Sequence, residues 1–441
     1  MEALRIRGTH GEDAAPITRL HILVTVLCGL VALLDGFDTQ SIAFVAPVIA
    51  GAWHRSSASF GPVFGAGLMG LTLGAFILSP VADRFGRKTI ILLAMTIFGG
   101  FAAATALASS MNELLVYRLL TGFGLGAAMP NIIALTSEYA PLRLRATLVT
   151  IMFCGFPLGS TLGGLISTPL IAAFGWPAIF ILGGVLPLLL LPFVAIWLPE
   201  SARFLAAKGD VRRVSENSER VGGVPAAVLE EPASGMPVLQ LFRAGRARVT
   251  CLLWLAFFMN LLVMYFLVNW LPSLLRASGQ PLEIAILSTS LLNLGGVAGA
   301  IVLGRVLDRL SPPLVLGTAY LGAALFIGVA ALGASILPVL LPAVFLAGFG
   351  VVGAQIGMNA MTAGIYPTAI RATGVGWALG VGRIGAIIGP VAGGLLLADG
   401  WTAEPLVLAA VAPALVAAAA VFGLAGIAKR TFVPSLGAQA V

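Results

Sequence analysis

Long apolar runs, separated by short polar segments, dominate the pattern of this chain. A helix needs about 20 mostly apolar residues to cross a bilayer, and only helices or closed barrels can do so. The runs are too long and too uniformly apolar for barrel strands, in which polar and apolar residues alternate. The pattern therefore predicts an all-α integral membrane protein with twelve transmembrane helices. The predicted spans are 20–47, 60–81, 89–109, 113–138, 147–173, 176–198, 249–275, 284–307, 313–333, 336–363, 372–398 and 403–427.

Composition agrees with lipid as the main solvent of the chain. Of the 441 residues, 59% are hydrophobic and 10% are charged, whereas soluble domains carry about 25% charged residues. The net charge of +7 does not indicate nucleic-acid binding, because the basic residues lie in short loops between apolar runs rather than in one patch. The three cysteines and three histidines are scattered. They suggest neither a disulfide framework nor a metal site, and no cofactor is expected.

The basic residues also predict the orientation. With the N-terminus in the cytoplasm, 21 of the 25 Lys and Arg residues fall in cytoplasmic segments, two fall in outer loops, and Arg118 and Arg383 fall inside spans. This asymmetry is the one seen in membrane proteins whose cytoplasmic loops are positive. Both termini are therefore expected in the cytoplasm.

Two halves of the chain repeat the same landmarks. LGAFILSPVADR (73–84) matches AGAIVLGRVLDR (298–309), and a Gly-Phe-Gly followed by Arg-Ala-Thr occurs in both halves at almost the same offset. Transporters are commonly built from such repeats, with the substrate bound near the midplane where the repeats meet. The predicted organisation is a cytoplasmic tail (1–19), a six-helix bundle (20–198), a cytoplasmic loop (199–248), a second six-helix bundle (249–427) and a cytoplasmic tail (428–441).

Three motifs resemble those of a known family. SPVADRFGRK (79–88) resembles the loop signature of the major facilitator superfamily, and YRLLTGFGLG (117–126) resembles its fourth-helix pattern. LDGFDTQSIAFVAP (34–47) resembles the first-helix signature of the aromatic acid:proton symporters, one branch of that superfamily. Two departures stand out: Ser79 replaces the usual first glycine of the loop signature, and the matching loop 304–313 lacks the later Gly-Arg-Lys.

The resemblance implies a symporter of the bacterial inner membrane that imports a benzoate-like acid together with protons by alternating access, as a monomer. Import of another small organic acid and efflux remain open as alternatives. The segment 155–164 lacks the Gly-Pro pattern of the proton-driven drug antiporters, which weighs against efflux. A membrane-bound enzyme has no nucleophile–base pair or phosphate loop to support it. A receptor built on the same fold would normally carry a signalling domain, and no such domain is expected here.

Charged residues inside the spans carry the functional hypothesis, because such groups are costly in lipid. Asp35 and Asp38 share one face of the first span. Two neighbouring carboxylates in a low dielectric favour the uptake of a proton by one of them, so both are predicted to couple transport to protons. The alternative is a structural cap or permanent pairing with arginine. Arg118 is predicted to be the third proton-coupling residue, which tunes the aspartates or assists proton transfer, with a purely structural ion pair as the alternative.

Arg383, near the middle of the eleventh span, is predicted to bind the substrate carboxylate, because a guanidinium offers two parallel donors. The alternative is a permanent pair with a first-span aspartate. Other polar and aromatic side chains within the spans are weaker candidates for contacting the substrate, because interhelical bonds and packing are commoner roles. These candidates are Asn131, Asn269, Asn293, Gln355, Asn359, Phe37, Tyr265 and Trp270, with Asn260 and Trp377 behind them.

A third group of residues predicts a cytoplasmic gate. Glu138 stands at the inner end of the fourth span, where it can form a salt bridge with the basic loop 84–88. Asp83 is expected to cap the eleventh helix near Arg371 in one state of the cycle. The expected role is conformational rather than catalytic. The complete set of predicted gate residues is Asp83, Arg84, Arg87, Glu138, Arg145, Asp308, Arg309 and Arg371.

Overall fold

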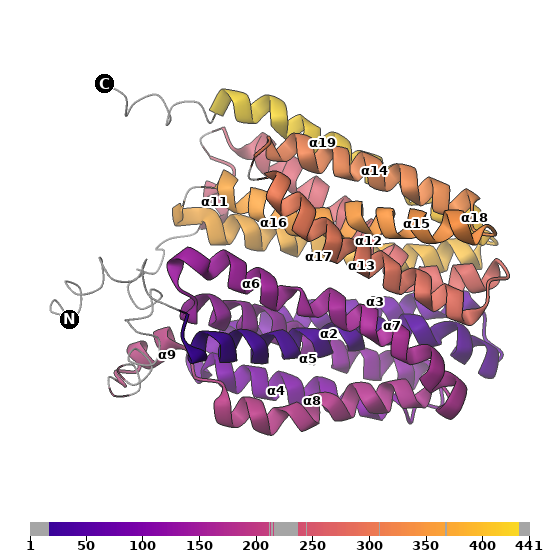
Figure 1. Ribbon diagram of the computed structural model, residues 1–441, viewed down its shortest axis with the longest axis horizontal. Helices are drawn as coiled ribbons and strands as arrows, with labels where there is room; N and C mark the ends of the chain where they lie inside the picture. The colour runs from indigo at the N-terminus through magenta and orange to yellow at the C-terminus, as the bar shows by residue number, and fades with distance from the viewer. Residues whose placement is uncertain are drawn as a thin grey trace. The chain divides into compact units, whose positions relative to one another are not determined.

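A computed structural model describes residues 17–210, 212, 215, 237–243, 245–307, 309–366 and 368–431 (Figure 1). All regular structure within these residues is helical. Twelve helices of this described part are long and apolar enough to cross a membrane. The prediction of an all-α protein with twelve spans is confirmed, and the predicted span ends agree with the helix ends to within a few residues.

The first six spans cover the N-terminal part of the described chain. They are α2 (Arg19–Ala52), α3 (Phe60–Phe85), α4 (Arg87–Thr105), α5 (Met111–Tyr139), α6 (Arg145–Phe153) continued by α7 (Gly155–Phe174), and α8 (Pro177–Trp197). A short helix, α9 (Ala202–Ala207), follows. Many large apolar side chains of these helices are exposed on the protein surface, as expected where the neighbour is lipid.

The last six spans follow another short helix, α11 (Pro237–Gln240). They are α12 (Ala247–Ala277), α13 (Leu282–Leu307), α14 (Pro312–Leu332), α15 (Leu337–Gly348) continued by the π-helical turn η5 (Phe349–Gly353) and α16 (Ala354–Ile365), α17 (Thr368–Ala398), and α18 (Ala403–Ala409) continued by α19 (Val411–Thr431).

The chain divides into two compact units. One unit holds the residues up to Ser41 and those from Ala66 into the central loop, and the other holds Ile42–Gly65 and the residues after that loop. The core of the first unit includes Met95 and Phe98, and that of the second includes Phe257 and Met358. The C-terminal part of α2 and the start of α3 thus belong to the second unit. The exact domain boundaries proposed from the sequence stay predictions.

Equivalent glycines let helices approach closely in each unit. In the first unit a Cβ atom on Gly70 or Gly74 would collide with the backbone of α5, at Leu119 or Phe123. In the second unit Gly295 and Gly299 meet the backbone at Phe345 and Phe349 in the same way. These pairs stand at the same offset of 225 to 226 positions as the repeated motifs. The repeat therefore extends from sequence landmarks to backbone contacts, which is how small residues pack membrane helices.

Candidate functional site

The middle of α2 holds two buried carboxylates, those of Asp35 and Asp38. Gly36, between them, lies so close to the backbone of Phe156 on α7 that a Cβ would not fit. Ser160 of α7 donates a hydrogen bond to the Gly36 carbonyl oxygen at 2.9 Å. These contacts fix this turn of α2 against α7, and thereby fix the positions from which both aspartates project.

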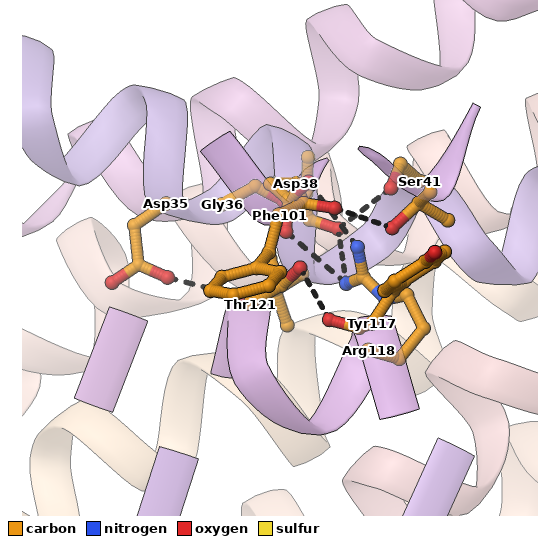
Figure 2. A network of polar contacts seen from close by, with 11 residues as sticks. Asp35, Gly36, Asp38, Ser41, Phe101, Tyr117, Arg118 and Thr121 are labelled. Carbon is orange, nitrogen blue, oxygen red and sulfur yellow. Dashed lines mark hydrogen bonds and ion pairs between the residues drawn. The ribbon is translucent and has the colours of Figure 1, made fainter. Parts of the chain in front are cut away.

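Asp38 forms a buried ion pair with Arg118 of α5 (Figure 2). Arg118 Nη2 is 3.1 Å from Asp38 Oδ2 and donates to the Asp38 carbonyl oxygen at 3.0 Å, and Nη1 donates to Oδ1 at 3.3 Å. The side chains are 0% and 3% exposed. The structure thus brings together two of the three predicted coupling residues, in a place where neither charge is screened by water.

The side chain of Asp35 points in a different direction from that of Asp38, although both project from α2. Its Oδ1 accepts a hydrogen bond from Thr39 at 3.1 Å, and Figure 2 shows its carboxylate pointing away from the Arg118 guanidinium. The i,i+3 spacing places both aspartates on neighbouring positions of one face, but only Asp38 enters the arginine pair. The two carboxylates are therefore chemically distinct groups.

Arg383 of α17 lies beside Tyr265 of α12, with its Nη1 donating to Tyr265 Oη at 3.4 Å. Arg383 is partly accessible, whereas Tyr265 is buried. A guanidinium next to a phenol hydroxyl presents several N–H and O–H donors in one place. Such a donor set suits a carboxylate, which accepts hydrogen bonds only.

Three of the predicted asparagines bond to their own helices. Asn131, Asn269 and Asn293 each donate from Nδ2 to the carbonyl oxygen four residues earlier, at 2.7–3.0 Å. This bond fixes each amide and directs its Oδ1 away from the helix backbone. An acceptor of that kind could receive a hydroxyl hydrogen from a ligand or from another helix.

The second unit contains a ladder of amides beside a π-helical turn. Asn260 of α12 donates from Nδ2 to Gln355 Oε1 at 2.7 Å and to the Val351 carbonyl oxygen, inside η5, at 3.3 Å. Gln355 in turn donates to Asn359 Oδ1 at 3.4 Å. A π-turn disturbs the regular bonding of a helix and is often found at functional sites. Asn260 stabilises that irregular turn and orients the two predicted substrate-contacting amides.

Replacing Asn260 by alanine is expected to destabilise the protein by about 1 kcal/mol, because it removes the donor shared by Val351 and Gln355 inside the membrane. Asn293→Ala, which removes an amide bonded within its own helix, is the matched control and should cost less. Thermal unfolding of the purified protein in detergent measures both. Equal unfolding temperatures for the two variants would contradict the bridging role of Asn260.

The predicted aromatic candidates lie in packed surroundings. Phe37 fits against Gly163 and Gly183, where a Cβ would lie 2.9 and 3.2 Å from its ring. Trp270 is fully buried in the second unit, meets Phe64 edge-on at 5.1 Å, and donates from Nε1 to the Pro390 carbonyl oxygen at 2.9 Å. Those contacts account for both side chains as packing residues, so their stacking on a substrate stays a prediction.

Glu138 anchors a charged cluster at the end of α5. Its carboxylate forms an ion pair with Arg87 and accepts a hydrogen bond from Ser201 Oγ at 2.7 Å. Next to it, Glu200 Oε1 accepts the backbone N–H groups of Lys88 and Ser201 at 3.1 and 2.8 Å, so that it caps the N-terminus of α4. Sequence reasoning placed Glu138 beside the basic loop but missed Glu200 and Ser201, which lie just after the sixth predicted span.

Gly86 makes this cluster possible. Its backbone has φ of 98°, in the region that favours glycine, and a Cβ there would collide with the Glu200 carboxylate. The chain can therefore turn sharply from α3 into α4 while Glu200 reaches the Lys88 N–H in the first turn of α4. Steric exclusion of a side chain therefore explains why the signature SPVADRFGRK has glycine at position 86.

Glu138→Gln is expected to lower the unfolding free energy by about 1–3 kcal/mol, because it removes the charge that faces Arg87 while keeping an acceptor for Ser201. The exposed Glu404, changed to Gln in the same way, should have a much smaller effect. Adding Arg87→Gln to Glu138→Gln should cost less than the two single changes together. Strict additivity, read from unfolding in detergent, would argue against a direct pair.

The other predicted gate residues differ in exposure where the structure describes them. Asp83, Arg84 and Arg309 are exposed, and Arg145 is partly buried. Asp308 and the side chain of Arg371 lie outside the described residues. The gate roles of these six residues stay predictions.

Comparisons with known proteins give further findings. A model of the Major Facilitator Superfamily matches residues 28–326 and 253–435. The 4-hydroxybenzoate transporter PcaK of Acinetobacter baylyi is 41% identical over 421 residues, 92% of each chain. The gallate transporter of Pseudomonas putida is 44% identical over 417 residues, 93% of each chain. The partially occluded, inward-open xylose transporter XylE of E. coli has the same fold, with a TM-score of 0.72, 18% identity, and coverage of 94% of this chain and 98% of XylE.

Proposed function

Because the chain belongs to the major facilitator superfamily, we propose that it imports a hydroxylated aromatic carboxylic acid together with protons by alternating access. The observation that carries this proposal is the similarity over nearly the whole chain to transporters named for 4-hydroxybenzoate and gallate, both of which are ring acids with hydroxyl groups. It agrees with the resemblance of the first-span motif to the aromatic acid:proton symporters.

Protons supply the driving force that an anionic substrate needs. Aromatic carboxylic acids are anions near neutral pH, and an inside-negative membrane opposes an entering anion by about 2.3 kcal/mol per 100 mV. One proton carried with each anion cancels this cost, and further protons make the potential itself a driving force. A carrier of such anions therefore requires at least one group that binds and releases a proton within the membrane.

The residues described above have separate roles in the proposal. Arg383 and Tyr265 bind the carboxylate through their donors, and the amides of Gln355 and Asn359 receive the ring hydroxyl. Asp38 binds and releases the proton. Arg118 stabilises the ionised form of the Asp38 carboxylate between these two steps. Asp35, which is not held by that arginine pair, delivers the proton to Asp38 or carries a second one.

The proposed setting is the inner membrane of a bacterium, with both termini in the cytoplasm and one chain as the working unit. The charged cluster at the cytoplasmic end of the first unit stabilises one state of the cycle. This cluster consists of Glu138, Arg87, Ser201 and Glu200. Opening at that end exchanges these contacts for water.

The substrate class can be tested by exchange in proteoliposomes. Vesicles loaded with unlabelled 4-hydroxybenzoate should take up the labelled acid, and an excess of gallate or benzoate should reduce this uptake. A hydroxylated ring acid should compete at the lowest concentration, and the aliphatic acid succinate should not compete at all. Stronger competition by succinate, or no exchange of any ring acid, would overturn the assignment. Export from right-side-out vesicles driven by an acidic exterior would instead indicate efflux by antiport.

A further inference from the structure

A phenylalanine on the sixth span completes the surroundings of the buried ion pair. The centre of the Phe180 ring lies 5.7 Å from Arg118 Cζ, and the ring is fully buried. This distance is within the range of a cation–π interaction, which gains strength when water is excluded. Phe180 belongs to none of the sequence motifs and lies in an apolar stretch, so the sequence alone does not distinguish it from its neighbours.

Helix α8 presents this ring from a fixed position. Trp176 meets the Phe180 ring edge-on, with centroids 6.0 Å apart and planes at 77°. Gly183 lies one turn further along the same face of α8, where a Cβ would come within 3.4 Å of Asp38 Oδ1. The absence of a side chain at Gly183 thus brings α8 against the carboxylate, while Phe180 meets the guanidinium. One face of α8 contacts both members of the pair.

The ring matters most when the pair is broken by a proton. Both Nη atoms of Arg118 bond to Asp38, whereas Nε has no hydrogen-bond partner among the described residues. When Asp38 is ionised, its charge largely cancels the field of the guanidinium at the ring. When Asp38 binds a proton, the guanidinium keeps its full charge in a buried place and loses its counter-charge. The negative face of the ring then has its greatest effect.

We propose that Phe180 is a positioning residue for proton coupling, because its ring stabilises the Arg118 cation during the part of the cycle in which Asp38 carries a proton. This inference rests on the proposed function, since it assumes that Asp38 is protonated during transport. Phe180 and its helix α8 then contribute to proton coupling, although no sequence motif connects either of them with it.

Other ionisable groups around the pair are few. Asp35 lies one turn away on α2, and Tyr117 and Glu113 lie near Arg118 on α5. Within the described spans, α7 and α8 contain no ionisable side chain, and the charged residues of α4, Arg87 and Lys88, stand at its other end. Asp35 and Glu113 are therefore the nearby carboxylates that could also shift a pH profile, and both stay unchanged in every variant below.

The test measures uptake of labelled 4-hydroxybenzoate into proteoliposomes as the external pH is varied at fixed internal pH. Removing the ring destabilises the state in which Asp38 is protonated, so Phe180→Leu should need a higher proton concentration to reach that state. Its half-maximal uptake should move to lower pH by about 0.5–1 unit. Phe180→Tyr and Phe180→Trp keep an aromatic ring at this position and should retain the pH profile of the unchanged protein. Phe193→Leu, on an exposed part of the same helix, is the matched control and should leave the profile unchanged.

A second series separates electrostatics from packing. Phenylalanines with one, two or three fluorine atoms in place of Phe180 keep nearly the same shape but weaken the negative ring face step by step. A graded shift of the profile with fluorine number is expected. A profile that does not move across the series overturns the inference, even if Phe180→Leu impairs uptake or folding. So does a wild-type profile in Phe180→Leu. If the unmodified protein itself takes up the acid independently of pH, the proposed proton coupling fails first, before any substitution is made.

Discussion

Asp38→Asn is expected to abolish accumulation of the aromatic acid driven by a pH gradient while leaving exchange of the acid across the membrane. An asparagine keeps the size of the side chain and can still accept a hydrogen bond from Arg118, which now lies 3.1 Å from Asp38 Oδ2. It cannot bind and release a proton near neutral pH. For each pH unit of the gradient, a symporter gains about a factor of ten in accumulation for every proton that it carries with the anion. This gradient-dependent factor should disappear in the variant.

Two measurements separate this loss from misfolding. Exchange of labelled for unlabelled acid requires the carrier to reorient but no net movement of protons, so it should persist at a measurable rate. Asp399→Asn, an exposed aspartate after α17, provides the control and should accumulate the acid as the unchanged protein does. Full gradient-driven accumulation by Asp38→Asn would exclude Asp38 as the proton carrier and leave its pair with Arg118 a structural one.

Arg383→Gln is expected to raise the KM for the acid by at least about 100-fold, because two charge-assisted hydrogen bonds to the carboxylate are lost and each contributes about 1.5–3 kcal/mol. Arg383→Lys keeps the charge but not the planar fork, so a smaller increase, about tenfold, is expected. Initial rates of uptake over a range of substrate concentrations give both values. The same experiment should show that Tyr265→Phe weakens binding by less, because it removes one neutral donor.

The matched control for Arg383 is Arg276 in the last turn of α12. Arg276 is exposed and donates to the Gln280 carbonyl oxygen at 3.3 Å. Arg276→Gln should leave the KM within about twofold of the original value. An unchanged KM in Arg383→Gln would show that Arg383 does not bind the carboxylate, and would favour its alternative role as a structural cation.

The twelve spans were predictable because lipid imposes a single solution on the backbone, and the length of each apolar run sets the length of its helix. The cost of a charge in lipid also made Asp35, Asp38, Arg118 and Arg383 recognisable as candidates. What the sequence could not predict is which partner each charge has. Asp38 and Arg118 are 80 positions apart, and their pairing depends on how α2 packs against α5.

Other features lacked a sequence signal because ordinary residues form them. The π-turn at Phe349–Gly353 lies in a glycine-rich stretch like several others in this chain, and its stabilisation by Asn260 comes from a helix 91 positions away. Phe180 is one of 24 phenylalanines, and only its distance to Arg118 marks it. Glu200 and Ser201 became part of the charged cluster because Gly86 allows the turn between α3 and α4. Contacts between distant segments, rather than local pattern, create these features.

The most direct test of proton-coupled import is net uptake of labelled 4-hydroxybenzoate into proteoliposomes that contain the purified protein, with and without a pH gradient, acidic outside. The account predicts that the gradient drives accumulation above the external concentration. It also predicts that a protonophore abolishes the accumulation and that acidification of the bulk solution without a gradient does not replace it. Uptake that stops at equal concentrations on both sides, whatever the gradient, would contradict it.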